Sequence, residues 1–328
     1  MNRQEAEAFR LMRSEKFPSL AAVIGRAGLA WGVEKHPLWV RLPYARRDGE
    51  RIEGVTSKRA NGFWGITRDD NDYTLATVGA AYEPISNEPA LAPVDRLVES
   101  GHFTLRGAGS FERGKHVWAY AAMDPLIIAG DQIDVGVFAR FSHGGGGLGY
   151  TPSFNRYVCL NQLNSLLQGI GGIARKALRQ LESRFRHTKG TPARLQSEAV
   201  LDVNKIVLVR EAFDSEAQKL LAAPWSRSEM EKLIRKLNPE PDRAIASKRA
   251  ITSWDNRFEA IMECYDAPDL ANVRGTQWQA INAITDFDQH YARVTGDEAK
   301  RQERLMEKML DPEKLVLQAE AILREERK

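Results

Sequence analysis

The period of the hydrophobic pattern changes abruptly near Asn161, and this change limits the fold more than any other feature of the sequence. In residues 116–121, side chains with a ring alternate with small aliphatic side chains, and this two-residue period is typical of a β-strand. Beyond Asn161 the apolar residues recur at about 3.6 positions, as in Leu195, Ala199 and Val203. We therefore predict an α+β fold: an antiparallel β-meander core with flanking helices, followed by a predominantly helical C-terminal half.

The first half contains several strand candidates separated by turn signals. Phe111 to Gly114 supplies one hairpin turn, and the four glycines 144–147 are expected to form the tip of another. Asn87 is placed to cap a helix over residues 88–99, whereas the polar residues between Thr56 and Asp72 are expected to be an exposed segment. The predicted strands are 38–42, 51–56, 73–82, 103–110, 116–123, 134–142 and 149–160.

The second half is predicted to be a series of helices. Ser226 and Glu229 have the spacing of a capping box, and Thr191 with Pro192 is typical of a helix start. We expect an α+β core over residues 1–190 and a helical region over 191–328, which either packs on the core or forms a separate domain. The predicted helices are 162–185, a long one from 191 to about 220, 230–237, 254–264, 275–294, 297–310 and 313–327.

Composition and motifs limit the classes of function that this chain can have. The 47 Lys and Arg residues nearly balance 44 Asp and Glu, so attraction to nucleic acid has to come from local clustering. Two distant cysteines, Cys159 and Cys264, and a charged N-terminus without an apolar stretch lead us to expect a cytoplasmic protein with no membrane segment. The phosphate-binding motif of ATPases does not occur, and the histidines lack metal-ligand spacing, so we expect no cofactor.

Two possible catalytic groups are present, and neither has a strong signal. Asp69, Asp70 and Asp72 could hold the divalent ions of a nuclease, although close-spaced acids are more often a solvated loop. Ser142 and His143 are adjacent along a predicted strand, so their side chains point to opposite faces and cannot form a nucleophile and base pair.

A cluster of basic residues is the strongest functional signal. Residues 175–194 contain seven Lys or Arg and one acid, Glu182. On a helix, Arg175, Lys176 and Arg179 share one face, and each phosphate that such residues neutralise releases counterions. Tyr157 or Phe154 could stack on unpaired bases, with a place in the protein core as the alternative. The candidate nucleic-acid-binding residues are Arg140, Arg156, Tyr157, Arg175, Lys176, Arg179, Arg184, Arg186, His187 and Lys189.

Several short segments, in order along the chain, resemble the phage/plasmid-like protein family that carries the domain of unknown function 932. The glycine run after His143 and Leu160 before Asn161 depart from that family's pattern. The matching segments are Val78 to Glu88, Gly107 to Gly114 followed by Val117 and Trp118, Phe141 to Gly144, Arg156 to Asn161, Arg186 to Thr188, and Trp278 to Asp286 with His290.

The order of elements is similar to the core of the single-strand annealing proteins of the Redβ, RecT and Rad type. This resemblance implies an ATP-independent, non-enzymatic protein of a phage or plasmid that forms rings or filaments on single-stranded DNA, more than RNA, and promotes annealing or recombination. Two alternatives stay open: a metal-dependent nuclease, and a regulatory or host-interference protein that binds a partner through its charged C-terminal helices.

Overall fold

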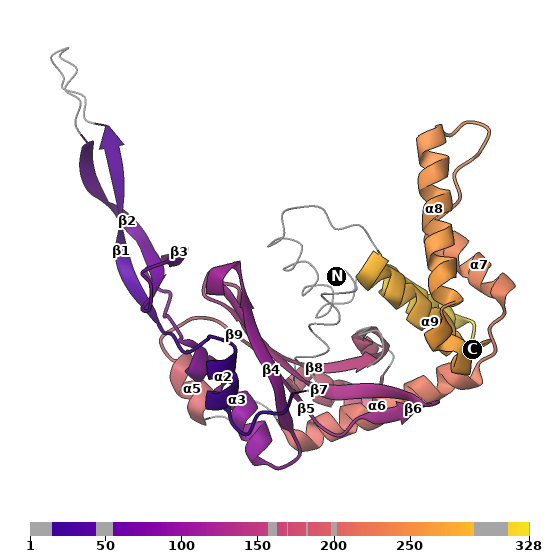
Figure 1. Ribbon diagram of the computed structural model, residues 1–328, viewed down its shortest axis with the longest axis horizontal. Helices are drawn as coiled ribbons and strands as arrows, with labels where there is room; N and C mark the ends of the chain where they lie inside the picture. The colour runs from indigo at the N-terminus through magenta and orange to yellow at the C-terminus, as the bar shows by residue number, and fades with distance from the viewer. Residues whose placement is uncertain are drawn as a thin grey trace.

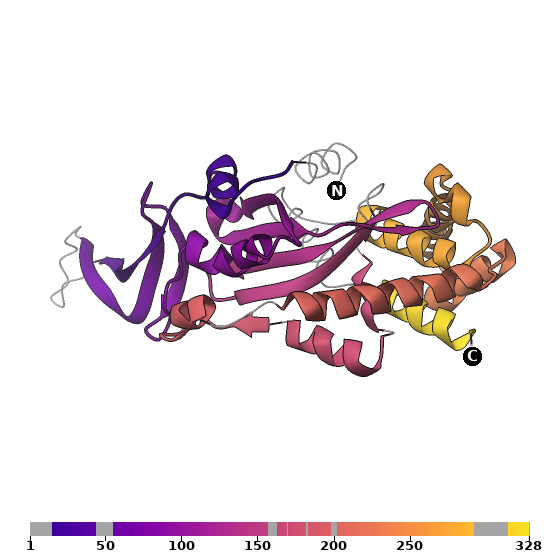
Figure 2. The ribbon, with the colours of Figure 1, turned by 90° about the horizontal axis from the view of Figure 1, so that it is seen from below.

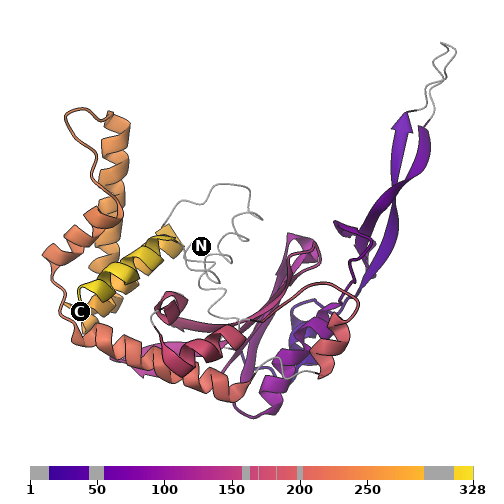
Figure 3. The ribbon, with the colours of Figure 1, turned by 180° about the vertical axis from the view of Figure 1, so that it is seen from behind.

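The computed structural model describes residues 15–43, 55–156, 163–168, 170–181, 183–197, 202–291 and 314–327. It confirms the α+β fold, with antiparallel sheets in the N-terminal half and mainly helices after them. In Figures 1 and 3 the larger sheet and helix α6 (Val203–Ala222) form a base. A β-hairpin rises from one end of that base, and helix α8 (Lys248–Tyr265) rises from the other (Figure 1).

The larger sheet is the predicted meander, and all its pairings are antiparallel. Its order is β4-β5-β7-β8-β9, and β6 pairs with β7. The glycine run closes the β7–β8 hairpin as expected: Ser142 lies opposite Gly147, and Gly145 has a φ of 101°, which favours glycine. The strands are β4 (Thr104–Phe111), β5 (His116–Ala122), β6 (Leu126–Ile128), β7 (Asp131–Ser142), β8 (Gly147–Arg156) and β9 (Ser183–Phe185).

The smaller sheet consists of β1 (Val33–Pro43), β2 (Val55–Arg68) and β3 (Thr74–Gly79) in that order. The polar residues that we expected to be exposed are mostly exposed, but they also extend strand β2 as far as Arg68. A bulge after Pro37 divides the β1–β2 pairing, and its outer part projects from the molecule (Figure 1). We call the outer part the arm.

Helices cover one face of the larger sheet and form the core with it. Tyr150 on β8 donates a hydrogen bond from its hydroxyl to the Ala90 carbonyl of α3 (Asn87–Glu99) at 2.7 Å. Phe154 is fully buried and stacks on Phe213 of α6, with ring centroids 4.2 Å apart. Phe154 is therefore a core residue rather than a platform for bases.

The other helices agree only partly with the predictions. Residues 162–185 do not form one helix, because 164–168 are a 3₁₀ helix, the α-helix begins only at Gly172, and 183–185 are strand β9. Asn87 is not the cap of α3, since Ser86 occupies the N-cap position. The capping box of α7 is confirmed, with both Ser226 and Glu229 hydrogen bonds formed. The remaining helices are α2 (Leu20–Arg26), α4 (Gly172–Leu181), α5 (Thr191–Ser197), α7 (Arg227–Leu237), α9 (Gln277–Asp286) and α11 (Lys314–Glu325).

Some predictions lie outside the described residues: those for Tyr157, Cys159, Asn161 and the helix 297–310. Within the described ranges, no helix combines the length and apolar character that crossing a membrane requires. Buried apolar residues on both sides of residue 190, from Leu20 to Leu323, belong to one cluster. The division into two domains stays a prediction.

Candidate nucleic-acid interface

Five basic side chains from α4 to the turn before α5 are exposed and have no acid partner among the residues that the structure describes. They come from three consecutive elements: helix α4, strand β9 and the turn before α5. Figure 2 shows these elements following one another along one long edge of the molecule. We call these residues the cationic strip: Lys176, Arg179, Arg184, Arg186 and Lys189.

Several exposed basic residues of the C-terminal half are neutralised by a nearby acid. Arg227 pairs with Asp266 at 2.7 Å, and Lys236 pairs with Glu326 at 2.8 Å. Arg235 and Arg243 likewise have carboxylate partners at 2.5 and 2.6 Å. The strip differs from these residues because its five cations have no acid partner among the described residues.

The register of β9 explains why Arg184 of the strip faces outward. Phe185 is buried opposite Leu148, so its neighbour Arg184 points to the other face of the sheet. Arg184 lies opposite Gly149, and Gly149 lies opposite Arg140 on the next strand. Arg140 and Arg184 thus share a sheet face about 10 Å apart, separated by a residue without a side chain. Arg140 is half-buried and lies beside the strip.

A buried polar cluster holds the turn that carries Arg186 and Lys189. The rings of Tyr82 and His187 stack with centroids 4.6 Å apart, and the Glu83 amide donates to the His187 carbonyl at 3.0 Å. Tyr82 donates its hydroxyl hydrogen to the His143 carbonyl at 2.9 Å, and His143 Nε2 lies 3.1 Å from Asn87 Oδ1. Three separate segments of the resemblance thus meet in one place, which their order in the sequence alone did not reveal.

The histidines of this cluster are neutral. Burial lowers the pKa of His143 to about 3, and the nearby His187, His116 and Arg68 charges add to this effect. Burial also lowers the pKa of His187, whose side chain is only 6% exposed. His187 was expected to contribute to phosphate binding, but it is a buried, neutral residue that positions its neighbours.

Arg156 is not part of the interface, and this candidate is wrong. Its side chain is only 1% exposed, and its Nε donates to Asp131 Oδ2 at 2.9 Å. Its Nη1 donates to Asp269 Oδ2 at 2.6 Å, so both ends of the guanidinium are neutralised by carboxylates. Arg156 therefore joins the meander to the 3₁₀ helix Pro268–Val273 of the C-terminal half.

Arg175 and two of the three candidate metal ligands, Asp69 and Asp70, already have hydrogen-bond partners. Arg175 is half-buried and donates from Nη1 to the Leu167 carbonyl at 3.0 Å. Asp70 binds Arg68 through both carboxylate oxygens, and this hydrogen bonding lowers the pKa of the Asp70 carboxyl. Asp69 accepts a hydrogen bond from the Gly32 amide. Over the described ranges, no three His, Cys, Asp or Glu side chains are grouped to hold a metal ion.

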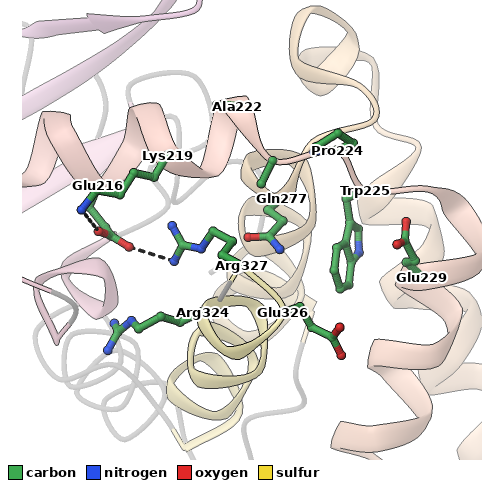
Figure 4. A pocket seen from close by; sticks show the side chains of 11 residues that line it. Glu216, Lys219, Ala222, Pro224, Trp225, Glu229, Gln277, Arg324, Glu326 and Arg327 are labelled. Carbon is green, nitrogen blue, oxygen red and sulfur yellow. Dashed lines mark hydrogen bonds and ion pairs between the residues drawn. The ribbon is translucent and has the colours of Figure 1, made fainter.

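A cavity of about 670 Å³ lies in the helical half, away from the strip, between α6, α7, α9 and α11 (Figure 4). Trp225 and Gln277 form part of its wall. Its charged groups neutralise one another, because Glu216 pairs with Lys219 at 3.1 Å and with Arg327 at 2.8 Å. The cavity therefore lacks the excess positive charge of the strip.

Comparison with known proteins gives one match. No curated protein and no solved structure matches the chain. The sequence model of one family, described as Domain of unknown function (DUF932), matches residues 74–310. The matched range includes β3, the larger sheet, the cationic strip and helices α6 to α9. Because the match covers most of the chain, the protein belongs to the DUF932 family.

Proposed function

We propose that this protein binds single-stranded nucleic acid, DNA more than RNA, through the cationic strip. The observation that carries the proposal is the strip itself: five exposed cations with no acid partner in the described part of the chain. A phosphate backbone is a regular row of negative charges. Neutralising it releases counterions and gives affinity that does not depend on base sequence.

The proposed role is annealing or recombination without ATP, in a homo-oligomer that a phage or plasmid encodes. A strip on a single chain contacts only a few phosphates, so copies side by side would be needed to hold a long strand. The order of helix, meander and basic segment, which is similar to that of single-strand annealing proteins, supports this role by analogy. Sedimentation velocity with and without a single-stranded oligonucleotide measures the assembly; a protein that stays monomeric in both would contradict it.

Binding is tested with labelled single-stranded and duplex oligonucleotides in low salt, by fluorescence anisotropy. The test variant replaces the five strip residues with alanine. The control variant replaces five basic residues that have acid partners, so both lose the same charge. The control residues are Lys205, Arg227, Arg235, Lys236 and Arg243.

We expect the wild type and the control variant to prefer single strands, and the strip variant to lose most of its affinity. Annealing of complementary labelled strands without ATP should follow the same order. An equal loss of affinity in the strip and control variants would show that only the total charge matters. Wild-type affinity in both variants would contradict binding at the strip. No binding by the wild type would instead favour the regulatory or host-interference alternative.

A further inference from the structure

The arm presents an exposed aromatic ring beside two guanidinium groups. Trp39 on β1 lies opposite Arg59 on β2, and Arg41 follows two residues after Trp39. Residues directly opposite or two apart share a face of a strand pair, so these three side chains lie on one side of the arm. Trp39 is 60% exposed. We call this side the arm face: Trp39, Arg41 and Arg59.

The arm is also a cationic element. In the described parts of β1 and β2 the one acid is Glu34, whose carboxylate lies 3.0 Å from His36 Nε2. Arg41 and Lys58 are exposed and have no acid partner among the described residues. The Arg59 guanidinium lies 5.1 Å from the centre of the Trp64 ring, which orients it without neutralising its charge.

Burial within the chain does not account for the arm face. A two-stranded hairpin that projects from a molecule gains little stability from its own side chains, and large aromatic residues are usually buried. An exposed ring flanked by arginines that have no acid partner among the described residues suits a ligand that has both flat apolar surfaces and negative charge. Unpaired bases on a phosphate backbone have both properties, whereas a duplex hides the faces of its bases.

The arm and the cationic strip are joined through one short segment. Lys35 on β1 donates from Nζ to the carbonyls of Ala80 and Tyr82, each at 2.7 Å. The next residue, Glu83, donates its amide hydrogen to the carbonyl of His187, in the turn that carries Arg186 and Lys189. The base of the arm and the strip turn are therefore both fixed to residues 80–83.

We propose that the arm face is a second contact for single-stranded nucleic acid, in which a base stacks on Trp39 and Arg41 and Arg59 bind the flanking phosphates. This inference rests on the proposed function and adds a specific stacking residue to it. Stacking on an aromatic side chain changes affinity by about 5-fold to 150-fold per base.

The test compares three substitutions on the arm. Trp39→Ala should weaken binding of an oligothymidylate by about 5-fold to 150-fold without changing its salt dependence, because no charge is lost. Trp39→Phe keeps a stacking ring and should recover most of the affinity. Val40→Ala is the matched control, since Val40 is the next residue, is 45% exposed and points to the opposite face. Cross-linking of an oligonucleotide with 5-bromodeoxyuridine should label the peptide that contains Trp39.

The outcomes separate this inference from the proposed function. If Trp39→Ala binds like the wild type while the strip variant does not, the arm inference fails and the proposed function stands. If neither variant differs from the wild type, both fail. If Trp39→Ala lowers the sedimenting mass of the protein without nucleic acid and leaves affinity unchanged, the arm face contacts a second copy of the chain, which overturns the inference.

Discussion

Arg156 shows how burial reverses the meaning of a basic residue. In the sequence it is one more positive charge close to the basic cluster, but in the structure it is enclosed by Asp131 and Asp269. Nothing in the sequence distinguishes it from an exposed arginine, because its partners lie 25 and 113 residues away. The acids that neutralise a cation are a property of the fold rather than of the local sequence.

Arg156→Ala should therefore lower the free energy of unfolding by about 3–5 kcal/mol, because it leaves Asp131 buried without a counter-charge. Urea unfolding followed by circular dichroism measures this change. Arg179→Ala is the control, since that residue is exposed and should change stability by less than about 0.5 kcal/mol. A stability loss for Arg156→Ala no larger than that of the control would contradict the buried ion pair.

His143 predicts how stability depends on pH. Its pKa in the folded protein is about 3, below the value of about 6.5 in an unfolded chain. Between those values the unfolded state binds the proton more readily, so the free energy of unfolding should fall as the pH is lowered from about 6.5. The slope for one such histidine is at most about 1.4 kcal/mol per pH unit.

Urea unfolding between pH 7 and pH 4.5 tests this dependence, with His143→Gln as the comparison. The variant should lose stability overall but show a shallower slope, and the remaining slope would come from His187 and other groups. Equal slopes in the wild type and the variant would mean that His143 is not held neutral by burial.

At the scale of elements, local sequence rules predicted many helices and strands, although they did not predict which side chains are buried. The capping box of α7 can be predicted from Ser226 and Glu229 alone. The meander can be predicted from the alternation of side chains along each strand and from the turn residues between strands. Strand β9 was missed because three residues carry no clear period, and it exists only through its pairing with β8. The arm was predicted only in part: the predicted strand 38–42 lies within β1, whereas the polar residues of β2 beyond Thr56 gave no strand signal.

Ser226→Ala should lower the free energy of unfolding by about 1 kcal/mol, because the serine hydroxyl accepts a hydrogen bond from the Glu229 amide at 3.3 Å. Thermal or urea unfolding measures the loss. Ser247→Ala removes the corresponding cap of α8 and should cost a similar amount, whereas Ser228→Ala, inside the first turn of α7, should cost less. Equal effects of Ser226→Ala and Ser228→Ala would contradict the capping role.

For the whole molecule, the sequence predicted the fold class and the position of the basic segment, but not which charges remain unneutralised. Lys176, Arg179, Arg184, Arg186 and Lys189 were among the candidates, and the structure shows them exposed and without acid partners in its described residues. Arg156 and His187 were candidates for the same reason and are buried. Nucleic-acid binding itself stays a proposal.

The salt dependence of binding tests the central claim most directly. For single strands, the logarithm of the binding constant falls by about 0.7 per neutralised phosphate for each tenfold rise in salt. If all five strip cations bind phosphates, the slope of the five-alanine strip variant should be shallower than that of the wild type by up to about 3.5. The charge-matched control variant should keep the wild-type slope. Equal slopes for the two variants would contradict a nucleic-acid interface at the strip.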